Sequence, residues 1–128
     1  MAQSSTTFHE SPDLLKPETM DRHRAIVSLM EELEAVDWYD QRLEAARDEE
    51  LRAILAHNRD EEKEHAAMVL EWLRRRDPHW DERLRNYLFA DKPILEREEE
   101  LDRQESAAGG KTLGDGSLRI GSLRACAK

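Results

Sequence analysis

Glu62 and His65 form a Glu-x-x-His step in the middle of the chain. Residues three apart on an α-helix share a face, so this carboxylate and this imidazole would point in the same direction. The apolar residues before and after them recur at helical spacing, which places both polar groups on a stripe suited to burial. Burial of such groups is costly unless something neutralises them, and a metal ion is the usual partner.

A bare Glu-x-x-His step arises often by chance in an acidic chain, so a second element must support the interpretation. Glu32 supports it, because it lies on the apolar face of the preceding segment, together with Leu29 and Val36. In an antiparallel hairpin that turns near residue 47, Glu32 would lie level with position 63, between Glu62 and His65. The alternative is that both carboxylates are solvated and the imidazole is a hydrogen-bonded surface group.

One hairpin offers two carboxylates and one imidazole, which is half of the ligand set of a carboxylate-bridged di-iron bundle. Two hairpins related by a two-fold axis would provide four carboxylates and two imidazoles. The ligand count therefore predicts two metal ions per dimer. Carboxylates are hard donors that suit Fe(III), and imidazole suits Fe(II), so iron is favoured; zinc or manganese could use the same donors.

Further acidic and aromatic residues on the first helix lie on faces at or beside that of Glu32. Glu31 and Glu34, with Trp38 one turn further along, form either a rim that collects cations or an ordinary acidic helix face. Tyr39 is either a hydrogen-bond donor or electron source beside the metals, or a packed tyrosine with its hydroxyl at the surface.

A second pair of potential ligands lies on the helix that carries His65. His57 and Glu61 are four residues apart and form either a peripheral metal site or a solvated pair. The remaining large side chains of this region, Met68, Trp72 and Trp80, are most simply packing residues of a core or an interface.

The elements that position these residues are long helices. Helical periodicity predicts a first helix from Pro17 to Ala46, a tight turn at 47–48 and an N-cap at Asp48. The second helix is expected to reach Arg76 or Asp77, since the residue before a proline avoids helical geometry.

Beyond residue 77 the pattern predicts shorter and more charged elements. We expect a third helix from Pro78 to about Phe89, a charged run from Glu96 to Glu105 as solvated helix or coil, and a linker at residues 107–110. The domain organisation is therefore a helical domain over 1–95, a charged flexible linker over 96–110 and a distinct tail over 111–128. The fold class is all-α: an antiparallel two-helix hairpin with a short C-terminal helix, which forms a ferritin-like four-helix bundle only on dimerisation.

Composition limits what the chain can bury and bind. Of the 128 residues, 38% are hydrophobic and 38% are charged, which favours helices that complete their burial against a second copy. A net charge of −9 argues against nucleic acid as a partner. The single cysteine, Cys126, excludes a disulfide within the chain and fits a reducing cytoplasm, and no signal peptide or bilayer-spanning segment is expected.

The sequence also resembles a known family, the encapsulated ferritins of bacteria. The resemblance covers about residues 8–95 and the tail. The matching words are Arg22-His23-Arg24-Ala25-Ile26-Val27, Glu31-Glu32-Leu33-Glu34-Ala35-Val36-Asp37-Trp38-Tyr39, His57-Asn58-Arg59-Asp60-Glu61-Glu62-Lys63-Glu64-His65-Ala66-Ala67-Met68, Glu71-Trp72-Leu73-Arg74-Arg75 and Tyr87-Leu88-Phe89.

The resemblance implies a ferroxidase whose centre assembles between two chains, with dimers arranged in a ring-shaped decamer. It implies Glu32, Glu62 and His65 as ligands, Tyr39 beside the centre, Glu31, Glu34 and Trp38 as a metal-uptake region, and His57 and Glu61 as a secondary site. The tail Asp115-Gly116-Ser117-Leu118-Arg119-Ile120-Gly121-Ser122-Leu123-Arg124 is similar to the family's targeting peptide, which docks into an encapsulin shell.

The expected function is therefore oxidation of Fe(II) for storage inside a cytoplasmic encapsulin nanocompartment. Two alternatives remain open from the sequence. One is another di-iron oxidoreductase, such as a peroxide reductase; the other is a metal-binding cargo protein with no enzymatic activity.

Overall fold

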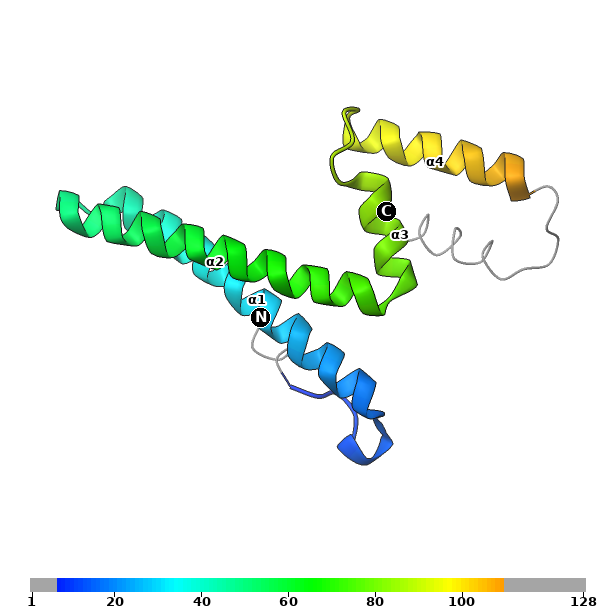
Figure 1. Ribbon diagram of the computed structural model, residues 1–128, viewed down its shortest axis with the longest axis horizontal. Coiled ribbons are helices and arrows are strands. Elements are labelled where there is room, and N and C mark those ends of the chain that lie inside the picture. The colour runs from blue at the N-terminus through cyan, green and yellow to red at the C-terminus, as the bar shows by residue number, and fades with distance from the viewer. Residues whose placement is uncertain (1–6, 110–128) are drawn as a thin grey trace. The chain divides into compact units, whose positions relative to one another are not determined.

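The structure, a computed structural model, describes residues 7–109, and this part of the chain is helical with no strand (Figure 1). The all-α prediction is confirmed. The chain divides into two units, Met1–Leu84 and Arg85–Lys128. The predicted targeting tail, residues 111–128, lies outside the described residues. The elements are a short 3₁₀ turn η2 (Pro12–Leu14), α1 (Pro17–Ala45), α2 (Glu49–Arg76), α3 (Pro78–Tyr87) and α4 (Ile94–Gly109).

Helices α1 and α2 pack against each other as the predicted hairpin (Figure 1). The turn lies where the sequence placed it, because Asp48 acts as the N-cap of α2 and its carboxylate accepts a hydrogen bond from the Leu51 amide at 2.8 Å. Arg52 closes the other side of the turn, donating to the carbonyl oxygens of Leu43 and Ala46, which lie at the end of α1. Each helix end at the turn therefore has at least one hydrogen-bond partner within the same chain.

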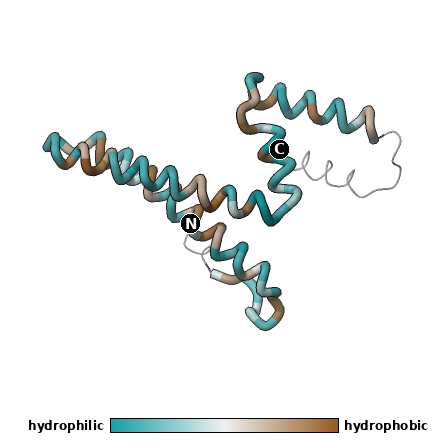
Figure 2. The backbone as a smooth tube through the Cα atoms, in the orientation of Figure 1, coloured by the Kyte–Doolittle hydropathy of each residue, from teal (hydrophilic) through white to brown (hydrophobic). Residues whose placement is uncertain are grey.

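The hairpin buries little of its apolar surface. Within residues 7–109, Ala66 and Leu73 are the only buried hydrophobic residues. By contrast, Leu33 is 56% exposed and Met68 is 61% exposed, and apolar residues alternate with polar ones along both helices (Figure 2). Two helices can shield only one side of each other, so the opposite sides still need a covering surface. No helix among the described residues is long and apolar enough to cross a bilayer.

Helix α3 starts as predicted and ends earlier than predicted. Asp77 caps its start, accepting from the His79 amide at 2.9 Å, with Pro78 in the first helical position. The helix ends at Tyr87 and not near Phe89, since Phe89 has a φ of 63°, in the left-handed region that cannot continue a right-handed helix.

The charged run from Glu96 to Glu105 is helical, since it lies within α4. This helix also includes residues 107–109, which the sequence analysis assigned to a linker, because two alanines prolong it up to the glycine pair. Arg97 fastens the start of α4 to the end of α3 by donating to the Asn86 carbonyl at 2.8 Å. The functional division into domain, linker and tail stays a prediction.

Candidate metal centre

The α1–α2 hairpin brings three potential metal ligands to one point. Glu32 comes from α1, and Glu62 and His65 come from one turn of α2. One ligand atom from each of the three lies within 4.8 Å of the others. This juxtaposition is the one that the height argument predicts, and within residues 7–109 no other group of three His, Cys, Asp or Glu meets that distance.

The hydrogen bonds of this trio leave one oxygen unsatisfied. His65 Nδ1 lies 2.9 Å from Glu62 Oε1 and 3.1 Å from Glu32 Oε2. A ring nitrogen carries at most one hydrogen, and Glu62 takes that hydrogen bond. Glu32 Oε2 is therefore buried with no hydrogen-bond partner among the described residues. An unpaired buried carboxylate oxygen is costly in a folded protein and is the kind of atom that a cation would satisfy.

The same arrangement shifts two pKa values. Burial, followed by the charge of Glu62, raises the pKa of Glu32, and His65 only partly opposes this shift. The hydrogen bond with Glu62, helped by the charge of Glu32, raises the pKa of His65. Each group therefore holds a proton to a higher pH than it would in water: Glu32 mainly because burial disfavours its charged form, and His65 because the neighbouring carboxylates favour its charged form.

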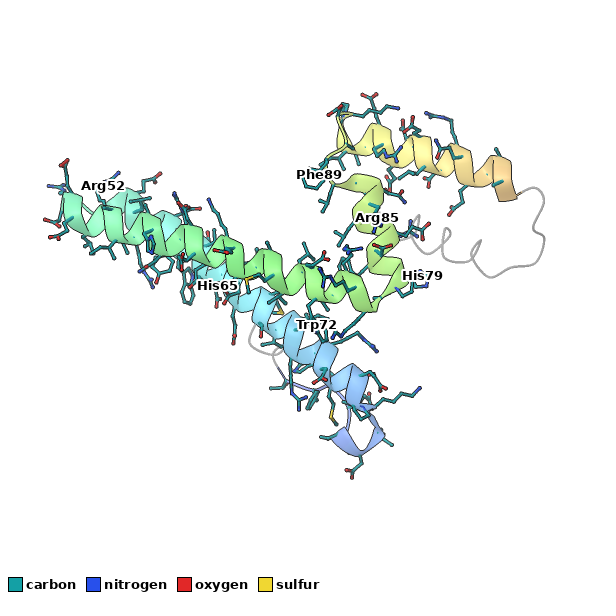
Figure 3. All side chains as sticks on the ribbon, in the orientation of Figure 1. Arg52, His65, Trp72, His79, Arg85 and Phe89 are labelled. Carbon is teal, nitrogen blue, oxygen red and sulfur yellow. The ribbon has the colours of Figure 1, made fainter. Side chains whose placement is uncertain are left out.

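The trio fits a hard or borderline divalent cation. Two carboxylates and an imidazole are the donors expected for Fe(II), manganese or zinc, and His65 would have to be neutral to bind such a cation. The side of the site away from the hairpin is open, since the His65 side chain is 48% exposed (Figure 3). Three donors from one chain leave room for further ligands from another.

Comparison with known proteins identifies the family of this chain. The profile of the EncFtn-like family matches residues 7–91, which is most of the described part of the chain. The chain belongs to the encapsulated ferritin family. It is similar to the encapsulated ferritin-like protein of Rhodospirillum rubrum, with 62% identity over 97% of this chain and 92% of that protein.

Two further relatives of this encapsulated ferritin chain extend the comparison. The encapsulin nanocompartment cargo protein EncC of Myxococcus xanthus is 33% identical over 73% of this chain and 76% of its own length. A crystal structure of a protein from Nitrosomonas europaea matches with a TM-score of 0.67 and 64% identity, over 68% of this chain and 96% of that one. That match supports the helical ferritin-like fold.

Two sets of contacts between α1 and α2 were missed by the sequence analysis. Arg59 donates to Asp40 at 3.1 Å, joining α2 to α1 two helical turns from Glu32. With the Arg52 contacts at the turn, this pair fixes the height of one helix against the other. In the predicted hairpin Asp40 lies level with position 55, one helical turn from Arg59, so height alone does not predict this pair and the reach of the arginine side chain decides it.

The predicted rim residues stay outside the trio. Glu31, Glu34 and Trp38 are exposed along α1. The guanidinium of Arg42 lies over the Trp38 ring at 5.8 Å and over the Tyr39 ring at 5.4 Å. This cation covers the aromatic pair and reduces the negative character of the face.

The predicted secondary site is also separate from the trio. His57 and Glu61 are both exposed on α2 and belong to no group of three potential ligands in the described part of the chain. Their role, like that of the rim, stays a prediction.

Proposed function

We propose that this chain is a ferroxidase that binds Fe(II) between two copies, oxidises it to Fe(III) with oxygen and delivers it for storage within an encapsulin shell. The observation that carries the proposal is the trio of Glu32, Glu62 and His65, with one buried carboxylate oxygen left unpaired. Iron is the substrate here. Each of two Fe(II) ions loses one electron, and oxygen accepts both.

Each ligand has a defined task at such a centre. The Glu32 and Glu62 carboxylates hold Fe(II) and continue to bind Fe(III), for which hard oxygens are the better donors. His65 contributes a neutral nitrogen, so the proton that its raised pKa retains must leave when iron binds. The exposed acids Glu31 and Glu34 attract Fe(II) to the neighbouring face.

Pairing follows from the open side of the hairpin. Two trios facing each other across a two-fold axis give four carboxylates and two imidazoles, enough for two iron ions per dimer. The exposed apolar side chains near the trio, such as Leu33 and Met68, support the same conclusion, because pairing would remove them from water. By the family resemblance, such dimers form a ring-shaped decamer.

Storage is assigned to the shell, because a small helical assembly cannot enclose a mineral. The relative from Myxococcus xanthus is an encapsulin nanocompartment cargo protein. We assign the tail, residues 111–128, to docking on the inner wall of the shell, in a cytoplasmic compartment. Its apolar positions Leu118, Ile120 and Leu123 would be the anchors.

The decisive experiment is an oxygen-consumption and Fe(III)-absorbance assay on the full chain and on Glu32→Ala, Glu62→Ala and His65→Ala. We expect the initial rate of each variant to fall to that of iron oxidising in buffer alone. Glu44→Ala, at an exposed position on α1, is the control and should keep the wild-type rate. Wild-type rates in all three trio variants would refute the proposal, and metal binding without turnover by the wild type would leave a cargo protein that only binds metal.

A further inference from the structure

An ion pair that crosses from α2 to α1 lies close to the trio. Arg59 on α2 donates to the Asp40 carboxylate on α1 at 3.1 Å and to its own neighbour Asp60 at 3.1 Å. The Arg59 side chain is 24% exposed, so the pair is partly shielded from water. Hydrogen bonding to Asp40 is the largest of the effects that raise the pKa of Arg59. Of its two acceptors, the one on the other helix therefore favours the charged guanidinium more.

This ion pair is inclined to the axes of the two helices. Asp40 lies level with position 55, so the Arg59 side chain reaches about one helical turn towards the hairpin turn. Arg52 joins the helices a second time, nearer the turn, by donating to the Leu43 and Ala46 carbonyls. One contact alone could act as a pivot. Two contacts at different heights oppose both the sliding of α2 along α1 and its rotation about its own axis.

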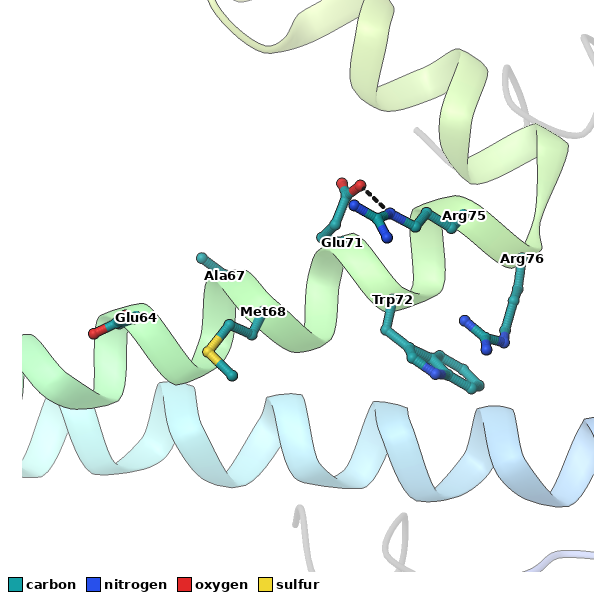
Figure 4. A pocket seen from close by; sticks show the side chains of 7 residues that line it. All are labelled: Glu64, Ala67, Met68, Glu71, Trp72, Arg75 and Arg76. Carbon is teal, nitrogen blue, oxygen red and sulfur yellow. Dashed lines mark hydrogen bonds and ion pairs between the residues drawn. The ribbon is translucent and has the colours of Figure 1, made fainter.

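The open end of the hairpin, beyond the trio, has no comparable contacts. In the part of the chain that the structure describes, no hydrogen bond or ion pair joins α1 to α2 there; Glu71, for example, pairs with Arg75 on its own helix (Figure 4). A cavity of about 220 Å³ lies at this end, and its lining residues are Glu18, Asp21 and Arg22 of α1 with Trp72 and Arg76 of α2. The directional contacts that set one helix against the other therefore lie between the turn and the trio.

Apolar packing is a weak substitute for these contacts. Ala66 and Leu73 are the buried hydrophobic residues within 7–109, and apolar contact is non-directional. The trio does not hold itself together either, because the charge of Glu62 disfavours a charged Glu32 beside it. In the metal-free chain, contacts outside the trio must therefore keep its two carboxylates close to each other.

We propose that Asp40 and Arg59 are positioning residues of the metal centre, since their ion pair holds the three ligands of the trio level before a cation binds. Arg59 lies three residues before Glu62 on α2, and Asp40 lies about two helical turns after Glu32 on α1. A site that is already assembled binds a cation more tightly than one that must first bring two like charges together. The inference rests on the proposed function, because it concerns the same trio.

The test measures Fe(II) binding to the full chain by isothermal titration calorimetry under anaerobic conditions. Asp40→Ala and Asp60→Ala form a matched pair, because each removes one carboxylate that accepts from Arg59 and only Asp40 lies on α1. We expect Asp40→Ala and Arg59→Ala each to weaken the apparent affinity about fivefold, the shift that a partly exposed ion pair can produce. Asp60→Ala should bind like the wild type.

The design separates positioning from charge and from stability. Asp40→Ala and Arg59→Ala change the net charge in opposite directions, so a loss of affinity in both cannot come from long-range attraction of the cation. Asp40 is 54% exposed, so its replacement should leave the chain folded, and metal-free Asp40→Ala and Asp60→Ala should melt at similar temperatures. The charge exchange Asp40→Arg with Arg59→Asp should recover most of the affinity that each single exchange loses.

Three results would overturn the inference: wild-type affinity in both Asp40→Ala and Arg59→Ala, an equal loss of affinity in Asp60→Ala, or a double exchange that binds as weakly as its single variants. If the wild type binds and oxidises Fe(II) and any of these results is found, the positioning role alone is wrong. If the wild type does not bind Fe(II), the proposed function itself is contradicted.

Discussion

The hairpin around the trio and the corner between α3 and α4 are unsatisfied in opposite ways. At the trio, polar groups converge and one buried oxygen, Glu32 Oε2, has no partner. At the corner, Lys92, Arg97 and Glu100 satisfy one another, while Phe89 has no apolar cover. The first region lacks positive charge, and the second lacks a surface. The comparison leads us to expect that a cation satisfies the first region and that an apolar surface from outside the chain covers the second.

Metal removal should produce the largest change. If Fe(II) binds at an interface between copies, metal at about 100 times its dissociation constant stabilises the paired state by about 2.7 kcal/mol. Thermal unfolding with Fe(II), and again after addition of a chelator, should differ by several degrees and should depend on protein concentration. In Glu62→Ala the two melting curves should coincide. If the two curves of the wild type are identical, the trio does not bind Fe(II) and is an ordinary cluster of surface charges.

Glu32→Gln should separate folding from metal binding. The metal-free variant should be more stable by about 1 kcal/mol, since an amide next to Glu62 can donate a hydrogen bond where a carboxylate is left unpaired. The same variant should lose the stabilisation that metal gives the wild type. Chemical denaturation with and without metal measures both effects. Glu44→Gln, at an exposed position on the same helix, should change neither value appreciably.

Phe89→Gly should show that the corner carries strain. Relief of the left-handed backbone is worth about 1–2 kcal/mol for a non-glycine residue, partly offset by the freedom that glycine gains on unfolding. We expect the melting temperature of a single chain to stay equal or to rise slightly. Leu88→Gly, one residue earlier and without positive φ, should lower it. Equal losses in both variants would show that position 89 is unstrained.

The smallest effect is expected at the ion pairs that Glu71 forms with Arg74 and Arg75 on α2. Arg74 and Arg75 lower the pKa of Glu71 to about 2. A lowered folded-state pKa stabilises the protein above the unfolded value near 4.5, and this stabilisation is lost as pH falls from there towards 2. Glu71→Gln should therefore lower the melting temperature slightly at pH 7, and less at pH 3.5. Glu64→Gln, without an ion pair in residues 7–109, should give no such pH-dependent difference.

The local pattern of the sequence was enough to define the hairpin. Prolines and Asp48 mark the ends of the helices. The apolar spacing places Glu32 on one face of the first helix and Glu62 and His65 on one face of the second, and these faces meet in any antiparallel pair that turns at residue 47. The convergence of the trio could be predicted because short-range rules and one turn position determine it.

Only the tertiary structure decided which polar side-chain atoms have a hydrogen-bond partner. Nothing in the spacing tells that Glu62 takes the His65 hydrogen bond and leaves Glu32 Oε2 unpaired, because angles and distances of about 3 Å between side chains decide it. The sequence did not predict the early end of α3 either, because that end also depends on contacts between residues that are distant in the sequence. Phe89 has no sequence preference for positive φ, and the contacts of Arg97 and Glu100 with residues eight to eleven positions earlier hold the corner that requires it.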